Sequence, residues 1–329
     1  MRLALGLALL LTFASARAQQ APLTLARELP LTNFDGRIDH MAIDHEHHRL
    51  FLAGIRTNEV LVLDYTSGQE LHRISGLSEP QGVLYLPASN RLFVTNGGTG
   101  DVNLYDASTF ALLHTTPLGG DADNIRYNAS NQTVLVGYGG DGSLSGIAFL
   151  DPNGNQKASI PLPNHPESFQ LDPAHDRVYI NVPRALKTIA ASLSTHKALA
   201  EYPAHGNFPM ALTPDGRTLF TGERHPGLLA QYNTSTGQRT ASLPLPDDCD
   251  DLFYDPAARR LYASSGSGTI SLFSLDSARH LTPLAAIPTV AGARTSLLDP
   301  ELHLLFVAAP HATGKPEGQP ARILLFNTH

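Results

Sequence analysis

The stretch Asp39–Ala53, which reads DHMAIDHEHHRLFLA, contains the unit that decides the fold. A polar entry leads into the short apolar strand Met41–Ile43, a polar turn follows, and a second apolar strand runs from Leu50 to Ala53. Two short apolar strands joined by a tight polar turn are typical of an antiparallel β-hairpin. The same unit returns along the rest of the chain.

Seven copies of this unit follow one another with a nearly constant spacing. The anchor is the central large side chain of the second strand, Phe51 in the first copy. Its equivalents are Phe93, Leu135, Tyr179, Phe220, Tyr262 and Phe306, at steps of 42, 42, 44, 41, 42 and 44 residues. That period is typical of a four-stranded propeller blade, whereas leucine-rich solenoids repeat at shorter intervals and α-repeats show helical periodicity. The sequence therefore predicts an all-β, seven-bladed β-propeller with four-stranded antiparallel blades.

The two ends of the chain together supply the last blade. The seventh copy has three strands, near residues 295–298, 304–308 and 322–327. Its missing fourth strand has a match near the start of the chain, because Leu25–Leu31 (LARELPL) resembles Arg239–Leu245 (RTASLPL), a fourth strand of the fifth copy. We expect the N-terminal strand to close the last blade, since an open ring would leave exposed strand edges.

The segment Leu92–Val102, which reads LFVTNGGTGDV, looks like the Y-V-T-N-x-x-x-x-x-V repeat signature of the YncE-like, or YVTN-repeat, propeller family, with Phe93 in place of Tyr. Gly36–Asp44 (GRIDHMAID) also resembles the exported bacterial members of that family. The resemblance covers essentially all of residues 19–329 and implies the same seven-bladed fold. It implies no catalytic residues, because the family shares no catalytic motif and a fold alone assigns no function.

The first eighteen residues have the pattern of a secretory signal peptide. A charged start is followed by the apolar run Leu3–Ala14 and by the A-x-A cleavage signal Ala16–Ala18. We expect residues 1–18 to be removed and residues 19–329 to form one propeller domain in the periplasm or outside the cell. A membrane anchor is the alternative, but this run is short for a bilayer, and no later segment is apolar enough to span one.

Charge and cysteine content narrow the classes of function. Loss of the two leader arginines takes the formal net charge from −7 to about −9. No basic run is present, so nucleic acid is not an expected partner. The single cysteine, Cys249, permits no internal disulfide and no C-x-x-C motif for metal or haem. A small molecule or a protein partner stays open, and we expect a monomer.

One column of positions gathers polar residues where the chain enters the first strand of each copy. In a propeller this strand lines the central channel, so the entry loops form one mouth of that channel. The column contains Asp39, Gln81, Asp123, Glu167, Phe208, Asp250 and Arg294, and the next one contains His40, Gly82, Asn124, Ser168, Pro209, Asp251 and Thr295. Carboxylates that are far apart in the chain are thus predicted to meet at one ring.

Two interpretations of this ring stay open. In the first, it binds a divalent metal ion or a small ligand. The expected metal ligands are Asp39, His40, Asp123, Glu167 and Asp250, and the expected ligand-binding residues are Gln81, Asn124, Ser168, Asp251 and Arg294. In the second, these polar side chains cap a water-filled channel and hydrogen-bond to strand ends. Clustered carboxylates repel one another unless a cation, a proton or Arg294 compensates.

Four other features of the sequence are candidate sites. Three contain side chains that can bind a metal or react, and the fourth is a long loop. Asp44–His48 (DHEHH) is expected to be a solvated turn, and Cys249, among the acids of Asp247–Asp251, is expected to point into packing with a raised thiol pKa. His165 and His205 lie in loops leading to the same mouth, where two interpretations stay open: they extend the site, or they are loop histidines without a role. The segment Pro310–Pro320 is expected to be a loop insertion, with a lid as the alternative.

Two classes of function are weighed against each other. The first is an exported binding or interaction scaffold that holds a small ligand or a metal ion at the channel mouth. The alternative is a metal-dependent lactonase- or lyase-type enzyme, with Asp39, Glu167 and Asp250 as metal ligands and His40 as general base or fourth ligand. A redox or metal-handling role is a third hypothesis, favoured by the 15 histidines.

Overall fold

The computed structural model describes residues 22–140, 144–311 and 320–329. The expected signal peptide lies outside the described residues, as does most of the loop Pro310–Pro320. Within them the chain forms seven sheets, each of four antiparallel strands. In the part of the chain that the structure describes, no helix is long and apolar enough to cross a membrane.

The strands follow the chain order in six blades, and the seventh blade combines both ends of the chain. Blades one and two comprise β2 (Ile38–Asp44), β3 (Arg49–Gly54), β4 (Glu59–Asp64), β5 (Glu70–Ser75), β6 (Pro80–Leu86), β7 (Arg91–Asn96), β8 (Asp101–Asp106) and β9 (Leu112–Pro117). Blades three and four comprise β10 (Asp121–Asn128), β11 (Thr133–Gly139), β12 (Gly146–Leu150), β13 (Gln156–Pro161), β14 (Ser168–Asp172), β15 (Arg177–Val182), β16 (Lys187–Ser192) and β17 (Ala198–Pro203).

The remaining blades have the same order of strands from the channel outward. Blades five and six comprise β18 (Asn207–Leu212), β19 (Thr218–Arg224), β20 (Gly227–Asn233), β21 (Arg239–Pro244), β22 (Cys249–Asp255), β23 (Arg260–Ser265), β24 (Thr269–Leu275) and β25 (Leu281–Pro288). Blade seven comprises β26 (Ser296–Asp299), β27 (Leu304–Ala309), β28 (Arg322–Thr328) and β1 (Leu23–Pro30). Short 3-10 turns lie at Pro87–Ser89, Pro173–His175 and Pro183–Ala185.

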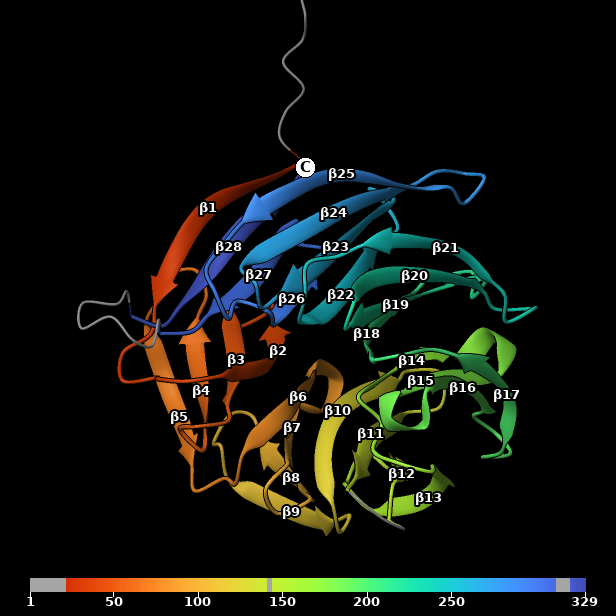
Figure 1. Ribbon diagram of the computed structural model, residues 1–329. Helices are drawn as coiled ribbons and strands as arrows, with labels where there is room; N and C mark the ends of the chain where they lie inside the picture. The colour runs from red at the N-terminus through yellow and green to blue at the C-terminus, as the bar shows by residue number, and fades with distance from the viewer. Residues whose placement is uncertain (1–21, 141–143, 312–319) are drawn as a thin grey trace, which may run out of the picture.

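The blades form a closed ring around a central channel, with the first strand of each blade innermost (Figure 1). β2, β6, β10, β14, β18 and β22 each contact the first strand of the next blade, and β26 contacts β2. β1 pairs antiparallel with β28, with Leu29 opposite Ile323. The predicted closure of the last blade by the N-terminal strand is therefore confirmed.

The core lies between neighbouring blades, and the anchor residues of the repeat are at its centre. All seven are fully buried: Phe51, Phe93, Leu135, Tyr179, Phe220, Tyr262 and Phe306 are each 0% exposed. Phe51 packs with Val83 and Tyr85 of the next blade. Burying such a side chain is worth roughly 1.5–3 kcal/mol. Because both faces of each blade are covered by its neighbours, the inner strands need apolar residues in nearly every position.

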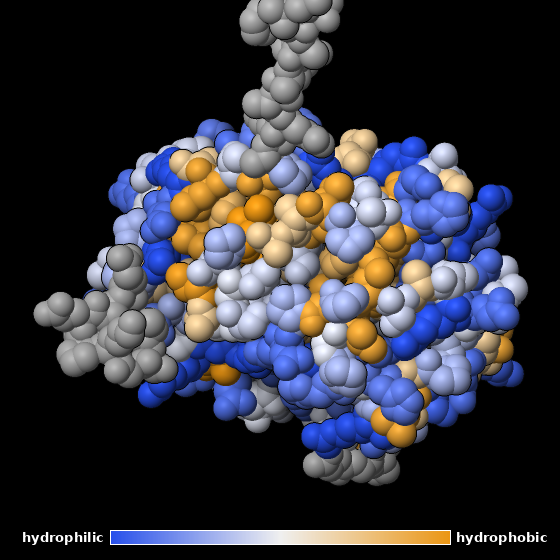
Figure 2. All heavy atoms as spheres, turned by 45° about the horizontal axis from the view of Figure 1, so that its top comes forward, coloured by the Kyte–Doolittle hydropathy of each residue, from blue (hydrophilic) through white to orange (hydrophobic). Residues whose placement is uncertain are grey.

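The outermost strands are partly exposed. Leu284 of β25 is 43% exposed and Leu25 of β1 is 50% exposed. Figure 2 brings the β25 side of the ring forward and shows apolar side chains on this wall, interrupted by polar ones. The outer wall therefore contrasts with the channel mouth, where charged side chains gather.

An aspartate at the end of the first strand caps the hairpin turn that follows in several blades. Asp44 Oδ1 accepts hydrogen bonds from two backbone N–H groups of its turn, at 3.1 and 3.4 Å, and Asp255 Oδ1 does the same at 2.8 and 3.1 Å. The histidines of the first turn are exposed. His47 Nδ1 lies 2.9 Å from Asp44, and His45 Nε2 lies 2.5 Å from Asp299. The segment Asp44–His48 is thus the solvated turn that the sequence predicts.

Candidate functional site

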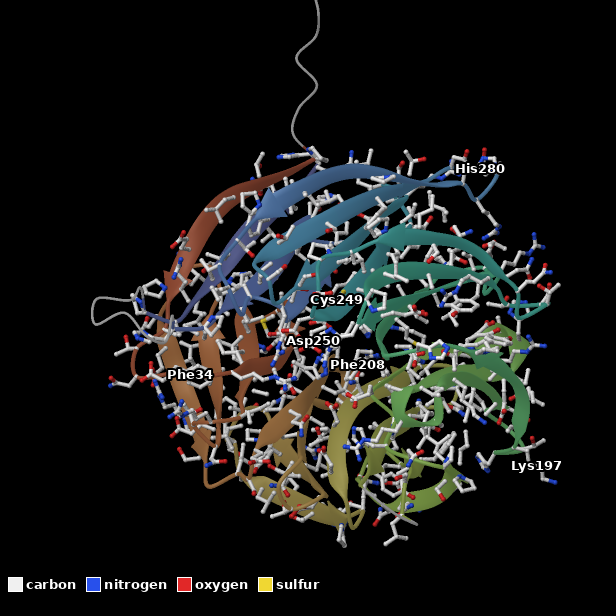
Figure 3. The ribbon with its side chains drawn as sticks, viewed as in Figure 1. Phe34, Lys197, Phe208, Cys249, Asp250 and His280 are labelled. Carbon is white, nitrogen blue, oxygen red and sulfur yellow. The ribbon has the colours of Figure 1, made fainter. Side chains whose placement is uncertain are left out.

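The first strands bring most of the predicted column to one mouth of the channel. Its cavity is lined by side chains from five first strands, β2, β10, β14, β18 and β22, and from Arg37 and Glu167, which directly precede β2 and β14. The lining residues include Asp39, Asp123, Glu167, Phe208 and Asp250. Figure 3 labels Asp250 and Phe208 near the centre of the ring. The blade register read from the sequence therefore places these distant positions correctly.

Asp39, His40 and Asp123 form a compact cluster, which we call the first metal group. One ligand atom of each residue lies within 4.8 Å of the other two, and His40 Nε2 is 3.5 Å from Asp123 Oδ1. Two ligands on one tetrahedral ion, with bonds near 2.1 Å, are about 3.4 Å apart. The group borders a cavity of about 40 Å³, which has room for one ion or one water molecule.

Two buried carboxylate oxygens of the first metal group lack a hydrogen-bond donor. Asp39 is 1% exposed, and its Oδ1 accepts a hydrogen bond from Arg37 Nη2 at 2.8 Å. Asp39 Oδ2 and Asp123 Oδ1 have no hydrogen-bond partner among the described residues. An unpaired buried acceptor costs roughly 1–3 kcal/mol, and a charged one costs more. A cation between these oxygens would remove that penalty.

The surroundings of His40 act on its protonation in opposite directions. Burial lowers the pKa of His40, but the carboxylates of Asp123, Asp39 and Asp251 outweigh burial and raise the pKa to about 9. Asn124 Nδ2 donates to the Glu167 carbonyl at 2.7 Å and lies 3.2 Å from His40 Nε2. A protonated Nε2 points its N–H toward Asp123 Oδ1, 3.5 Å away, whereas the neutral ring can present its lone pair there. A metal ion binds the same lone pair, so the ring can serve as imidazolium or as ligand.

Asp123, His165 and Glu167 form a second cluster, which we call the second metal group. One ligand atom of each lies within 4.8 Å of the others, and His165 Nε2 is 3.9 Å from Asp123 Oδ2. The three residues line an adjoining cavity of about 430 Å³. Burial and the Asp123 carboxylate raise the pKa of Glu167 to about 6. His165 thus extends the site as the sequence suggests, whereas His205 is exposed.

Asp250 lies among arginines rather than in either metal group. Arg294 Nε is 3.1 Å from Asp250 Oδ2, Arg37 Nη2 is 3.4 Å from the same oxygen, and Arg224 pairs with Oδ1. The Arg224 guanidinium also lies 3.5 Å from the centre of the Phe208 ring. Within the described ranges the two metal groups do not include Asp250. This side of the mouth therefore has its charges balanced by arginine.

The predicted ligand-binding residues link neighbouring blades. Gln81 Nε2 donates to Asp121 Oδ1 of β10 at 2.7 Å, the Ser168 hydroxyl donates to a backbone carbonyl of β18, and Asp251 Oδ2 accepts from a backbone N–H of β26 at 2.7 Å. Asn124 Nδ2 donates a hydrogen bond to the backbone carbonyl of Glu167, just before the first strand of the next blade. Arg294 forms an ion pair with Asp250 of the preceding blade. These side chains join the first strands of adjacent blades around the mouth.

Several residues at the mouth escaped the sequence prediction, although a signal for most of them was present. They stand two positions before the predicted column, mostly in the loops that lead into the first strands, so the same repeat brings them to the mouth. That earlier column reads Arg37, Glu79, Asp121, His165, Gly206, Asp248 and Gly292, of which only His165 was predicted to extend the site. Arg224 comes from the end of β19, four residues after the anchor Phe220, and no column predicts it.

Cys249 precedes Asp250 on β22 and points the other way. It is 0% exposed, and Figure 3 labels it beside Asp250 near the inner end of its blade. Burial and the nearby Asp251 carboxylate raise the pKa of the Cys249 thiol to about 12. The prediction that this cysteine packs inside the protein with a raised pKa is confirmed.

Comparison with known proteins fits the fold. No protein-family model matches the chain. Two curated proteins described as "Uncharacterized protein YncE", from Salmonella typhi and from Salmonella typhimurium strain LT2, are 29% and 28% identical to it over 97 residues. The chain is a seven-bladed β-propeller, and over this segment it resembles the YncE proteins. The matched segment covers 30% of this chain and 27% of each relative.

Solved structures with the same architecture show how widely it occurs. A structure of hydrazine synthase from Kuenenia stuttgartiensis overlays this propeller with a TM-score of 0.73 and 15% sequence identity. The overlay covers 89% of this chain and 95% of that chain. A chain in a structure of the mitotic checkpoint complex overlays it with a TM-score of 0.77 and 16% identity, covering 100% and 99%. At such identities these likenesses show the fold alone.

Proposed function

We propose that the protein is an exported binding propeller that holds a divalent transition-metal ion at the first metal group. The observation that carries the metal site is the pair of buried oxygens, Asp39 Oδ2 and Asp123 Oδ1, that have no donor in the described part of the chain and lie beside His40. Export rests on the leader pattern of residues 1–18. The periplasm or the medium is the proposed location.

The donor set narrows the kind of ion. One imidazole nitrogen and two carboxylates suit ions such as Zn²⁺, Mn²⁺ or Fe²⁺. Arg37 supports the site from outside, because it occupies Asp39 Oδ1 and leaves Oδ2 for the ion. The adjoining cavity of about 430 Å³ has the size of a small-molecule site. It is bordered by Arg37 and Arg224 and by carboxylates that a bound cation would neutralise, namely Glu79, Asp121, Asp123 and Glu167. An anionic small molecule is the ligand that these arginines and a bound cation favour.

Calorimetric titration of Zn²⁺ into chelator-stripped protein tests this proposal. We expect saturable binding, and we expect Asp39→Asn to weaken it at least about tenfold, because losing even an outer partner of a metal ligand costs 10–100-fold. His175→Asn is the control, since His175 pairs with Asp172 on an exposed turn. Absence of binding, or equal affinity in all three proteins, would refute the proposed site.

One observation favours the enzymatic alternative as a second candidate. Glu167 lies on the wall of the 430 Å³ cavity, and its pKa of about 6 suits a general base near neutral pH. A metal-dependent lactonase or lyase would use the ion as Lewis acid and Glu167 to move a proton. Turnover of a panel of lactones by the metal-loaded protein, lost in Glu167→Gln, would support this candidate. A metal-loaded protein without turnover would count against it.

A further inference from the structure

We propose that the Asp123 carboxylate bridges two metal ions, the second of which is bound by His165 and Glu167. This inference rests on the proposed metal-binding function and adds a second ion to it. The two metal groups share Asp123 and no other residue. The question is therefore whether the shared carboxylate offers a different oxygen to each group.

The two oxygens of Asp123 face two different histidines. Oδ1 lies 3.5 Å from His40 Nε2, and Oδ2 lies 3.9 Å from His165 Nε2. Both separations are close to the roughly 3.4 Å between two ligands of one tetrahedral ion, so an ion fits on each side after shifts of a few tenths of an ångström. In two-metal sites the ions lie about 3.5–4 Å apart, a separation that a carboxylate with one oxygen on each ion can span.

The donors on the two sides of Asp123 are matched. The first side adds one histidine and one carboxylate, His40 and Asp39, and the second side adds His165 and Glu167. Each ion would thus receive one nitrogen and two carboxylates, counting the shared one. Such a mixed donor set suits Mn²⁺, Fe²⁺ or Zn²⁺ at both positions.

The orientation of His165 points to metal binding through Nε2. His165 Nδ1 lies 3.3 Å from the Gly139 carbonyl oxygen. Because a carbonyl only accepts, Nδ1 must carry a proton, and in the neutral ring this leaves the lone pair on Nε2, which faces Asp123. A metal-binding histidine usually donates its other N–H to a carbonyl or carboxylate, which fixes the ring and its tautomer. The His165 side chain is 11% exposed, so this arrangement is held inside the mouth.

The balance of charge also favours added cations on this side. Asp121 stands beside the second metal group and lines the same cavity as Asp123, His165 and Glu167. The arginines Arg224 and Arg294 are paired with the acids on the other side of the mouth. A second divalent ion would compensate Asp121, Asp123 and Glu167, which have no ion pair with these two arginines among the described residues.

The two ions would differ in access. The first metal group borders the cavity of about 40 Å³ and the second lines the cavity of about 430 Å³. An ion at the second position therefore keeps coordination positions open to a ligand from the channel mouth, as catalytic and ligand-binding ions do. The first ion would mainly hold Asp123 in place.

Manganese loading of the full chain tests the bridge. Chelator-stripped protein is incubated with excess Mn²⁺ and desalted, its metal content is measured by mass spectrometry, and its electron paramagnetic resonance spectrum is recorded. We expect two Mn²⁺ per chain and a spectrum broadened by exchange coupling through the carboxylate. His165→Asn should hold one Mn²⁺ with the six-line spectrum of an isolated ion, and the control His175→Asn should hold two.

The outcomes separate this inference from the proposed function. One Mn²⁺ per wild-type chain with a six-line spectrum would overturn the bridge and leave the single-ion proposal standing. Two uncoupled ions would also overturn it. No bound metal would overturn both proposals and favour a mouth neutralised by protonated histidines. The wild-type measurement decides the question even if circular dichroism shows that His165→Asn is misfolded.

Discussion

The place of Asp123 in the ring depends on Gly82 and Thr95 of the preceding blade. Thr95 Oγ1 donates to the Asp123 carbonyl at 2.7 Å and accepts a hydrogen bond from the Gly82 N–H at 2.7 Å. A Cβ at Gly82 would lie 2.3 Å from the Asp123 carbonyl oxygen, far inside contact distance. The glycine therefore permits the close approach of β6 and β10 that positions the shared carboxylate.

Gly82→Ala should accordingly destabilise the protein and disturb the metal site. Overpacking typically costs 1–3 kcal/mol, so we expect the free energy of unfolding to fall by about 2 kcal/mol and Zn²⁺ to bind more weakly. Urea unfolding followed by circular dichroism measures the first effect. Gly140→Ala is the control, because no described atom lies within 4 Å of a Cβ built there. Identical unfolding midpoints for the two variants would contradict this explanation.

The hairpin between β2 and β3 depends on the ionised form of Asp44. Arg49 Nε donates to Asp44 Oδ2 at 2.8 Å. Burial raises the pKa of Asp44, but the hydrogen bonds from Arg49 and His47 outweigh burial and lower the pKa below the ordinary value of 3.8. A carboxyl with a lowered pKa in the folded state stabilises that state above its unfolded pKa. This stabilisation disappears as the pH falls through the folded-state pKa.

Asp44→Asn should therefore lower the melting temperature at pH 7, because it keeps an oxygen for the turn but loses the charge that faces Arg49. The difference from the wild-type protein should shrink as the pH falls below 3.8. Melting curves between pH 7 and pH 3 check this expectation. A difference that stays constant over that range would mean that the charge of Asp44 does not contribute.

The closing strand β1 should contribute through its buried side chains alone. Leu29 is 1% exposed and packs in the cluster that joins the last and first blades, whereas Leu25 on the same strand is 50% exposed. Leu29→Ala should lower the free energy of unfolding by about 3 kcal/mol, and Leu25→Ala should change it by no more than about 0.5 kcal/mol. Equal effects in a denaturant titration would show that β1 does not close the ring as described.

The molecule as a whole shows why its fold could be predicted from the sequence. Each blade buries the same position of its second strand. A large apolar side chain is therefore required at that position in every blade, from Phe51 to Phe306. The regular spacing of these side chains is enough to identify seven blades. The same register placed Asp39, Asp123 and Asp250 at one mouth. These predictions depend only on the backbone period, which every blade obeys.

The chemistry of the mouth was harder to predict, because it depends on which side chains pair across blades. Asp250 belongs to the same column as Asp39, yet Arg224 reaches it from the end of β19, outside any repeating position. His165 stands in a loop before β14, and the contact of its Nδ1 with the Gly139 carbonyl of β11 leaves its Nε2 facing Asp123. Such pairings between non-equivalent positions leave no period in the sequence.

The central claim is that the blade register gathers Asp39, His40 and Asp123 around a metal ion at the channel mouth. Anomalous diffraction at the zinc absorption edge, from crystals grown with Zn²⁺, tests it most directly. The claim predicts a seven-bladed ring whose strongest anomalous peak lies about 2.0–2.2 Å from the ligand atoms of these residues. No peak at the mouth, or a peak only at the exposed turn Asp44–His48, would contradict it.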